Sequence, residues 1–243
     1  MKQFIFKTVM PFEKWRVATL ETKEPGTVKW IEEEVGPDDV VYDIGANMGI
    51  YSVLAGSRGA TVYAFEPHQP TAAHLIENIQ VNGLEGLVTV FTTALHSEEG
   101  YLTFNYYSKE AGSSGSQLGH AVDEFGREFV PAFKEQLRVT TIDRLVVAGT
   151  IQPATCIKLD VDGNEHFVLQ GMATLLKELP PRLIQVEVHP SDDEKVVEFM
   201  DGFDYIVDKR HWTQMGQEAI DKGYNPAKVA HNVIFRPCGK LAA

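Results

Sequence analysis

The residues best suited to chemistry begin with a glycine-rich turn that is followed by a carboxylate. The run VVYDIGANMG places Asp43, Gly45, Asn47 and Gly49 where an apolar strand is predicted to turn into a helix. Glycines at such a turn let a ligand approach the backbone closely. The next apolar run, TVYAFEP, contains Glu66, and a carboxylate roughly 20 residues after such a turn is where α/β sheets bind ribose hydroxyls. Together the two features predict a site for an adenosine-containing cofactor.

Charge indicates which cofactor the turn would bind. Asp43 would repel the pyrophosphate of a dinucleotide but attract the sulfonium and ammonium groups of S-adenosylmethionine. Asn47 also stands where the G-x-G-x-x-G pattern has its second glycine, which leaves less room for a pyrophosphate at the helix N-terminus. Each feature taken singly is also explained by a structural role, with glycines that only shape a turn and Glu66 as a solvated strand end. Their occurrence on successive strands favours S-adenosylmethionine, and an NAD-dependent oxidoreductase is the rival interpretation.

The predicted cofactor site draws on the ends of three strands. The adenine is expected beside the loop after the third strand, where backbone groups and an apolar side chain suffice to bind it. The predicted cofactor-binding residues are Asp43, Gly45, Ala46, Asn47, Gly49, Ser52, Glu66, Pro67, Ala94 and Leu95.

A second charged cluster is predicted where two further strands end. With a period of two, Lys158 and Asp160 point to one side of the run ATCIKLDV, and Glu187 and His189 share a side of the run IQVEVHP. If these strands are neighbours, the four groups gather at the carboxyl ends of the sheet, where open α/β folds bind ligands. Burial of such groups is costly unless they pair or serve chemistry. We therefore predict that these four residues form a catalytic cluster.

Within this cluster, His189 and Asp160 are predicted to handle a proton of the substrate. Histidine titrates near neutrality, whereas Asp160 would orient it or act as the base if burial raised its pKa. Lys158 and Glu187 are expected to form a supporting ion pair behind them. Two alternatives stay open: a purely structural cluster built on that ion pair, and a metal ion that bridges Asp160 and the Glu187/His189 pair. No residue is assigned to a resident metal.

The elements that must position these residues alternate between strand-like and helix-like segments. Apolar runs of strand length occupy residues 40–46, 61–67, 87–95, 154–161 and 182–188, and helix-like segments such as 70–81 lie between them. This alternation is typical of βαβ units and a buried parallel sheet with helices on both faces. The final runs FDYIVD and HNVIFRP predict an antiparallel edge, and Asp162 with Glu165 predicts the cap of a helix.

The 243 residues are interpreted as one domain, residues 1–243. Residues 1–35 are predicted to form an N-terminal extension and helix. Residues 111–136 lack a strong period, and they are predicted to form an inserted lid or loop over one end of the sheet.

Composition and charge limit the classes of partner that this domain is expected to bind. Apolar residues make up 44% of the chain and charged residues 23%, which is typical of a globular protein, and the net charge of −12 disfavours nucleic acid and anionic membranes as partners. Cys156 and Cys238 are expected to be reduced thiols. Because the first residues show no signal-peptide pattern, a cytoplasmic location is expected. The sequence does not indicate an oligomeric state.

Several motifs in a fixed order resemble the FkbM family of S-adenosylmethionine-dependent methyltransferases. The resemblance covers residues 40–190 and rests on VYDIGANMGIYS, AFEP, TALHSEEG, GSSGS, VTTIDRL, IKLDVDGNEHFVLQGM and IQVEVHP. It implies a Rossmann-like class I fold, with a mostly parallel seven-stranded sheet and an antiparallel last strand. It also implies O-methylation of a small-molecule hydroxyl, commonly on a sugar or polyketide. Asp162 and Arg144 depart from the family pattern, and a methyltransferase-like protein that binds a ligand without catalysis is a third interpretation.

Overall fold

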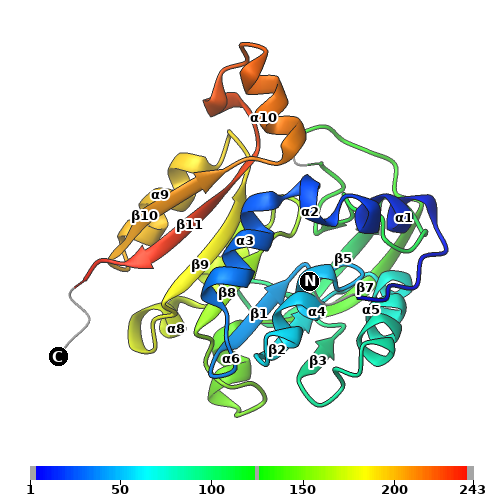
Figure 1. Cartoon of the computed structure of the whole chain (residues 1–243), viewed down its shortest axis with the longest axis horizontal. Helices are drawn as coiled ribbons and strands as arrows, with labels where there is room; N and C mark the ends of the chain where they lie inside the picture. The colour runs from blue at the N-terminus through cyan, green and yellow to red at the C-terminus, as the bar shows by residue number, and fades with distance from the viewer. Residues whose placement is uncertain (1–3, 124–125, 240–243) are drawn as a thin grey trace.

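A seven-stranded sheet forms the centre of the computed structural model, which describes residues 4–123 and 126–239 (Figure 1). Its strand order is β10-β11-β9-β8-β1-β2-β3. The strands are β1 (Val40–Ile44), β2 (Thr61–Phe65), β3 (Val88–Phe91), β8 (Cys156–Leu159), β9 (Leu183–Val188), β10 (Tyr205–His211) and β11 (His231–Pro237). The pairs among β3, β2, β1, β8 and β9 are parallel, whereas β11 is antiparallel to both β9 and β10. The predicted fold class, including the antiparallel last strand, is confirmed.

Helices cover both faces of this sheet because its central strands are apolar on both sides. One face packs against α3 (Pro25–Glu34), α4 (Ile50–Ser57) and α5 (Gln69–Val81). The other face packs against α6 (Ile142–Val147), α7 (Glu165–Gln170), α8 (Ala173–Glu178) and α9 (Asp193–Asp201). The two resulting cores hold the ends of β1, β2 and β8 in fixed positions relative to one another.

A second, smaller sheet contradicts part of the prediction for residues 87–136. Its strand order is β4-β7-β5-β6, and its strands are β4 (Ala94–Leu95), β5 (Gly100–Tyr106), β6 (Gln117–Leu118) and β7 (Phe133–Thr140). The single strand expected over residues 87–95 is therefore two strands in different sheets, because the chain leaves the large sheet after Phe91 and pairs with β7 at Ala94. Part of the predicted insertion, of which residues 124 and 125 lie outside the described residues, is also strand.

Short helices lie at both ends of the described chain. The predicted N-terminal extension, apart from residues 1–3, contains α1 (Pro11–Ala18) and α2 (Leu20–Lys23) ahead of α3. Near the C-terminus, α10 (Gln214–Asp221) and the 3₁₀ helix η1 (Pro226–Lys228) connect β10 to β11, and α10 projects beyond the end of these strands (Figure 1). Both cysteines are free thiols, as expected. None of the helices in the described residues is long and apolar enough to cross a membrane.

Candidate active site

The site lies where the central sheet changes its direction of winding. From β1 the chain adds β2 and β3 on one side, whereas β8 and β9 lie on the other side, so the connections after β1 and β8 diverge. Open α/β sheets bind ligands at such a switch point. The two strand ends nevertheless approach closely, since a Cβ atom at Gly45 would lie 1.7 Å from the carbonyl oxygen of Asp160. With its φ of +79°, position 45 therefore requires glycine.

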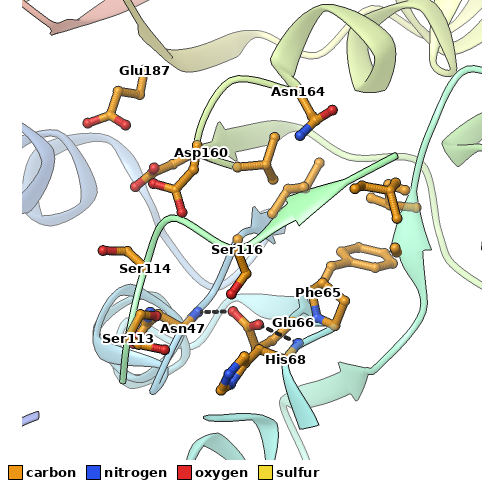
Figure 2. Close-up of a pocket in the computed structure, with 18 of the residues that line it drawn as sticks. Asn47, Phe65, Glu66, His68, Ser113, Ser114, Ser116, Asp160, Asn164 and Glu187 are labelled. Carbon is orange, nitrogen blue, oxygen red and sulfur yellow. Dashed lines mark hydrogen bonds between the residues drawn. The ribbon is translucent and has the colours of Figure 1, made fainter. Parts of the chain in front are cut away.

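A cavity of about 350 Å³ occupies this edge of the sheet, a size typical of small-molecule sites. Figure 2 shows Asp160 and Glu187 at one end of the cavity, and Glu66 with Phe65 at the other. Nine of the predicted site residues line this cavity: Gly45, Asn47, Glu66, Pro67, Ala94, Leu95, Asp160, Glu187 and His189. A smaller adjoining hollow is lined by Ala46 and Lys158. The structure thus brings both predicted groups of residues to one place.

At the first end, backbone groups fix the carboxylate of Glu66. The N–H of Asn47 donates to Oε2 at 2.8 Å, and the N–H of His68 donates to Oε1 at 2.8 Å (Figure 2). Each oxygen keeps a lone pair, so the group can accept two further hydrogen bonds from neighbouring hydroxyls. Burial raises the pKa of Glu66 to about 7, although the two N–H donors oppose that increase. The geometry suits the paired hydroxyls of a ribose.

Apolar side chains continue this end of the cavity beyond Glu66. Phe65 and Leu95 are almost fully buried, and Phe104 and Leu118 of the smaller sheet face the same space. Such a slot suits a flat aromatic ring bound by packing rather than by charge. The small sheet, which the sequence did not predict, thus supplies part of the wall where the adenine is expected.

Asp43 lies behind the glycine-rich turn rather than in the cavity. It is buried beneath the turn, and Ser52 Oγ donates to its Oδ2 at 2.5 Å. Burial raises the pKa of Asp43, while the positive charge of Lys158 opposes this. Of the predicted cofactor-binding residues, Asp43, Gly49 and Ser52 line neither hollow. Their geometry fits an indirect role, in which they hold the turn in position for the residues that line the cavity.

At the second end, the predicted ion pair between Lys158 and Glu187 is wrong. Lys158 Nζ lies 2.9 Å from Asp160 Oδ2 and 5.0 Å from the centre of the Tyr51 ring. The strand register explains the difference, because Lys158 pairs with Gln185 and the continuation of that register sets Glu187 beside Asp160. Lys158 therefore neutralises the aspartate that directly follows its own strand.

The two carboxyl groups at this end have opposite pKa shifts. Burial would raise the pKa of Asp160, but Lys158 and Lys23 hold it well below its usual range. Burial and the negative charges of Asp160 and Glu24 raise the pKa of Glu187 well above its usual range. The direction of this shift favours the ionised form of Asp160 and opposes the expectation that burial raises its pKa and makes it the base. Glu187 holds its proton more tightly and shares a hydrogen bond with Asp160.

Asp162 lies in the cavity as well, which the sequence analysis missed. Its predicted role as a helix cap is wrong, because α7 begins at Glu165 and Asp162 instead accepts a hydrogen bond from the Gly115 N–H at 2.8 Å. Carboxylate oxygens of Asp160, Asp162 and Glu187 all lie within 4.8 Å of one another. Oxygen ligands of this kind suit a hard divalent cation. If a metal ion binds here, its ligands would therefore be these three carboxylates, without His189.

The N-terminal helices also supply residues that no sequence motif indicated. Glu24 is fully buried and accepts hydrogen bonds from Lys23 Nζ at 2.6 Å and from Thr27 Oγ1 at 3.2 Å. Lys23 and Arg16 line the cavity. These residues precede the stretch that resembles the FkbM family, and their spacing carries no recognisable pattern.

Comparison with known proteins identifies the class to which this site belongs. A crystal structure of methyltransferase FkbM from Methylobacillus flagellatus has the same fold, with a TM-score of 0.58, 15% identity, and coverage of 92% of this chain and 52% of that chain. The fold is accordingly that of the class I methyltransferases.

The family follows from the sequence comparison. The model of the methyltransferase FkbM domain matches residues 43–210, and the chain belongs to this family. It is 30% identical over 187 residues to the hexuronic acid methyltransferase AglP of Haloferax volcanii, covering 76% of this chain and 70% of that protein. It is 26% identical over 200 residues to the 31-O-demethyl-FK506 methyltransferase FkbM of Streptomyces tacrolimicus, covering 72% and 75%. The protein is a methyltransferase, which decides against the oxidoreductase and the inactive binding protein.

Proposed function

We propose that this enzyme transfers a methyl group from S-adenosylmethionine to a hydroxyl oxygen of a small-molecule acceptor, such as a sugar or a polyketide. One observation carries the proposal: a single cavity joins the Glu66 carboxylate to the charged cluster of Asp160, Glu187 and His189. The two relatives named for a hexuronic acid and for demethyl-FK506 support an acceptor of this class.

The residues of the cavity fit the cofactor. In our proposal Glu66 binds the ribose hydroxyls, the apolar slot beside Leu95 binds the adenine, and the Gly45–Asn47 backbone with Asp160 binds the methionine end. When bound, S-adenosylmethionine supplies an electrophilic methyl group on a positively charged sulfur. The carboxylates of the cavity favour that positive charge and disfavour the pyrophosphate of a dinucleotide.

The acceptor hydroxyl would lie among the residues of the charged end and lose its proton there. In our proposal the hydroxyl donates its hydrogen bond to His189, which takes the proton, and the negative charge of Asp160, kept ionised by Lys158, favours the imidazolium that forms. Glu187 supports Asp160 through their shared hydrogen bond. Most of the acceleration is expected from holding the oxygen in line with the methyl group.

Residues 111–136 are proposed as the lid of this site within a single domain. Asn47 Nδ2 donates to the Ser113 carbonyl at 3.0 Å, and the Gly115 N–H donates to Asp162 Oδ2 at 2.8 Å. The segment therefore contacts both the glycine-rich turn and the residues after β8, and Ser113, Ser114 and Ser116 form part of the cavity wall (Figure 2).

Mass spectrometry tests the proposed activity. The purified chain is incubated with S-adenosylmethionine and a library of sugar and polyketide hydroxyl compounds, and we expect a product heavier by one methyl group on oxygen. Asp160→Asn should lose this product, whereas the exposed Glu194→Gln on α9 should keep it. Transfer only to nitrogen or carbon acceptors, or equal activity of Asp160→Asn and the wild type, would contradict the proposal.

A further inference from the structure

Two cations reach the cavity from the N-terminal helices, outside the residues that the family model matches. Arg16 of α1 and Lys23 of α2 line the cavity together with Glu66 and Asp160. Both also line the smaller hollow beside Asn47 and the turn that precedes α4. Part of the cavity lining therefore comes from residues that precede the matched range of 43–210.

A buried contact holds α1 over the cavity. Glu13 is fully buried, and its carboxylate accepts hydrogen bonds from the N–H groups of Val9 at 2.8 Å and Met10 at 2.9 Å. The same carboxylate pairs with His74 of α5. A Cβ atom at Gly112 would lie 2.6 Å from Glu13 Cγ, so the loop after β5 also packs against this residue. Arg16, one turn further along α1, is positioned by these contacts.

Arg16 differs from the other cations of the site in its partners. Lys158 pairs with Asp160 at 2.9 Å, and Lys23 pairs with Glu24 at 2.6 Å. Arg16 Nε donates to the carbonyl of Gly112 at 3.0 Å, and within residues 4–123 and 126–239 it forms no ion pair. Its charge still acts on the cavity: burial raises the pKa of Glu66, and the positive charge of Arg16 opposes that increase.

We propose that Arg16, with Lys23 beside it, binds the carboxylate of a ligand in this cavity. The inference rests on the proposed function and adds the group that the N-terminal helices recognise. A guanidinium matches a carboxylate geometrically and can form two parallel hydrogen bonds with it.

Two sources of the carboxylate fit this chemistry: the methionine end of the cofactor and an acidic acceptor. The smaller hollow favours the cofactor. It offers Arg16 and Lys23 together with the ionised Asp160, and an amino acid group presents a carboxylate and an ammonium that match these opposite charges.

Calorimetry with two ligands tests the proposal. S-Adenosylhomocysteine carries the amino acid group, whereas 5′-methylthioadenosine lacks it. Arg16→Gln is expected to weaken S-adenosylhomocysteine binding about tenfold or more and to leave methylthioadenosine binding unchanged. Arg16→Lys should recover part of the loss, and Lys14→Gln, an exposed cation on the same helix, should bind both ligands as the wild type does.

A third titration tests whether the carboxylate that Arg16 binds belongs to the acceptor. If Arg16→Gln binds S-adenosylhomocysteine normally, the loaded proteins are titrated with the methyl glycosides of glucuronic acid and of glucose. Loss of binding to the glucuronide alone in the variant would assign the carboxylate to the acceptor.

Two results would overturn the proposal. The first is identical binding of all four ligands by Arg16→Gln and the wild type. The second is an equal loss for S-adenosylhomocysteine and methylthioadenosine, which would mean that the substitution only loosens the loop at Gly112. Failure of the proposed function looks different, because the wild type itself would then bind neither adenosine ligand.

Discussion

The two ends of the cavity hold their carboxylates in different ways. At the end that contains Glu66, which we propose for the adenosine and call the adenosine end, two backbone N–H groups fix the Glu66 carboxylate. The position of this carboxylate therefore depends on the backbone and not on other side chains. At the charged end, Lys158 pairs with Asp160, and Asp160 shares a hydrogen bond with Glu187. The pKa values of the two carboxyl groups are shifted in opposite directions. Strong coupling of this kind is typical of groups that take part in chemistry. We infer from the comparison that the end with Glu66 contributes mainly to cofactor affinity and that the charged end contributes mainly to turnover.

The largest expected effect separates turnover from affinity at the charged end. Asp160→Asn and His189→Ala should each lower kcat by about 10²- to 10⁴-fold, the usual contribution of a positioned proton acceptor. For His189→Ala, the affinity for S-adenosylhomocysteine should change by less than about threefold, because Glu66, the adenine slot and Asp160 remain intact. Steady-state kinetics and calorimetry on the same preparations give both numbers. Full activity in both variants would remove the charged cluster from the mechanism.

At the adenosine end we expect the opposite, a large loss of cofactor affinity with a smaller change in kcat. Glu66→Ala removes an acceptor for two ribose hydroxyls, and charge-assisted hydrogen bonds contribute about 1.5 to 3 kcal/mol each. The Kd for S-adenosylhomocysteine should therefore rise at least about tenfold, with a smaller change in kcat at saturating cofactor. An unchanged Kd would refute the assignment of Glu66 to the ribose.

The affinity for S-adenosylhomocysteine should depend on pH, because Glu66 titrates near neutrality. Burial raises the pKa of Glu66 to about 7, and the ribose hydroxyls require its ionised form. Protons compete with the cofactor below that pKa, so the affinity for S-adenosylhomocysteine should fall about tenfold as the pH drops from about 8 to about 6. Glu66→Gln cannot titrate and should show a flat profile over this range. A wild-type profile equally flat would show that Glu66 does not titrate with the ligand.

The smallest effect is expected from metal removal. We expect chelator treatment to leave the activity unchanged, because Lys158 already neutralises Asp160. Loss of activity that Mg²⁺ restores would contradict this and would assign the trio of Asp160, Asp162 and Glu187 to a cation. In that case Asp162→Asn should weaken the restoration by Mg²⁺.

Local patterns predicted the central sheet and much of the site. The apolar runs that became β1, β2, β8 and β9 are buried on both faces, and period two correctly placed Asp160 and Glu187 at one edge. The pairing within that cluster was wrong because the register between β8 and β9, which no local pattern reveals, sets Glu187 beside Asp160.

The small sheet and the N-terminal part of the site lacked a local signal. The strands of the small sheet are short or partly exposed, so their apolar pattern is weak. The contacts that hold α1 over the cavity join residues far apart in the chain, with separations of 61 residues for Glu13 and His74 and 96 for Arg16 and Gly112. Periodicity along the sequence cannot predict such contacts.

We propose that this cavity binds S-adenosylmethionine through Glu66 and the glycine-rich turn. Titration calorimetry of the wild type with S-adenosylhomocysteine and, separately, with NAD tests it most directly. We expect one-site binding of S-adenosylhomocysteine that Glu66→Ala weakens, and no measurable binding of NAD. Binding of NAD without binding of S-adenosylhomocysteine would contradict this proposal.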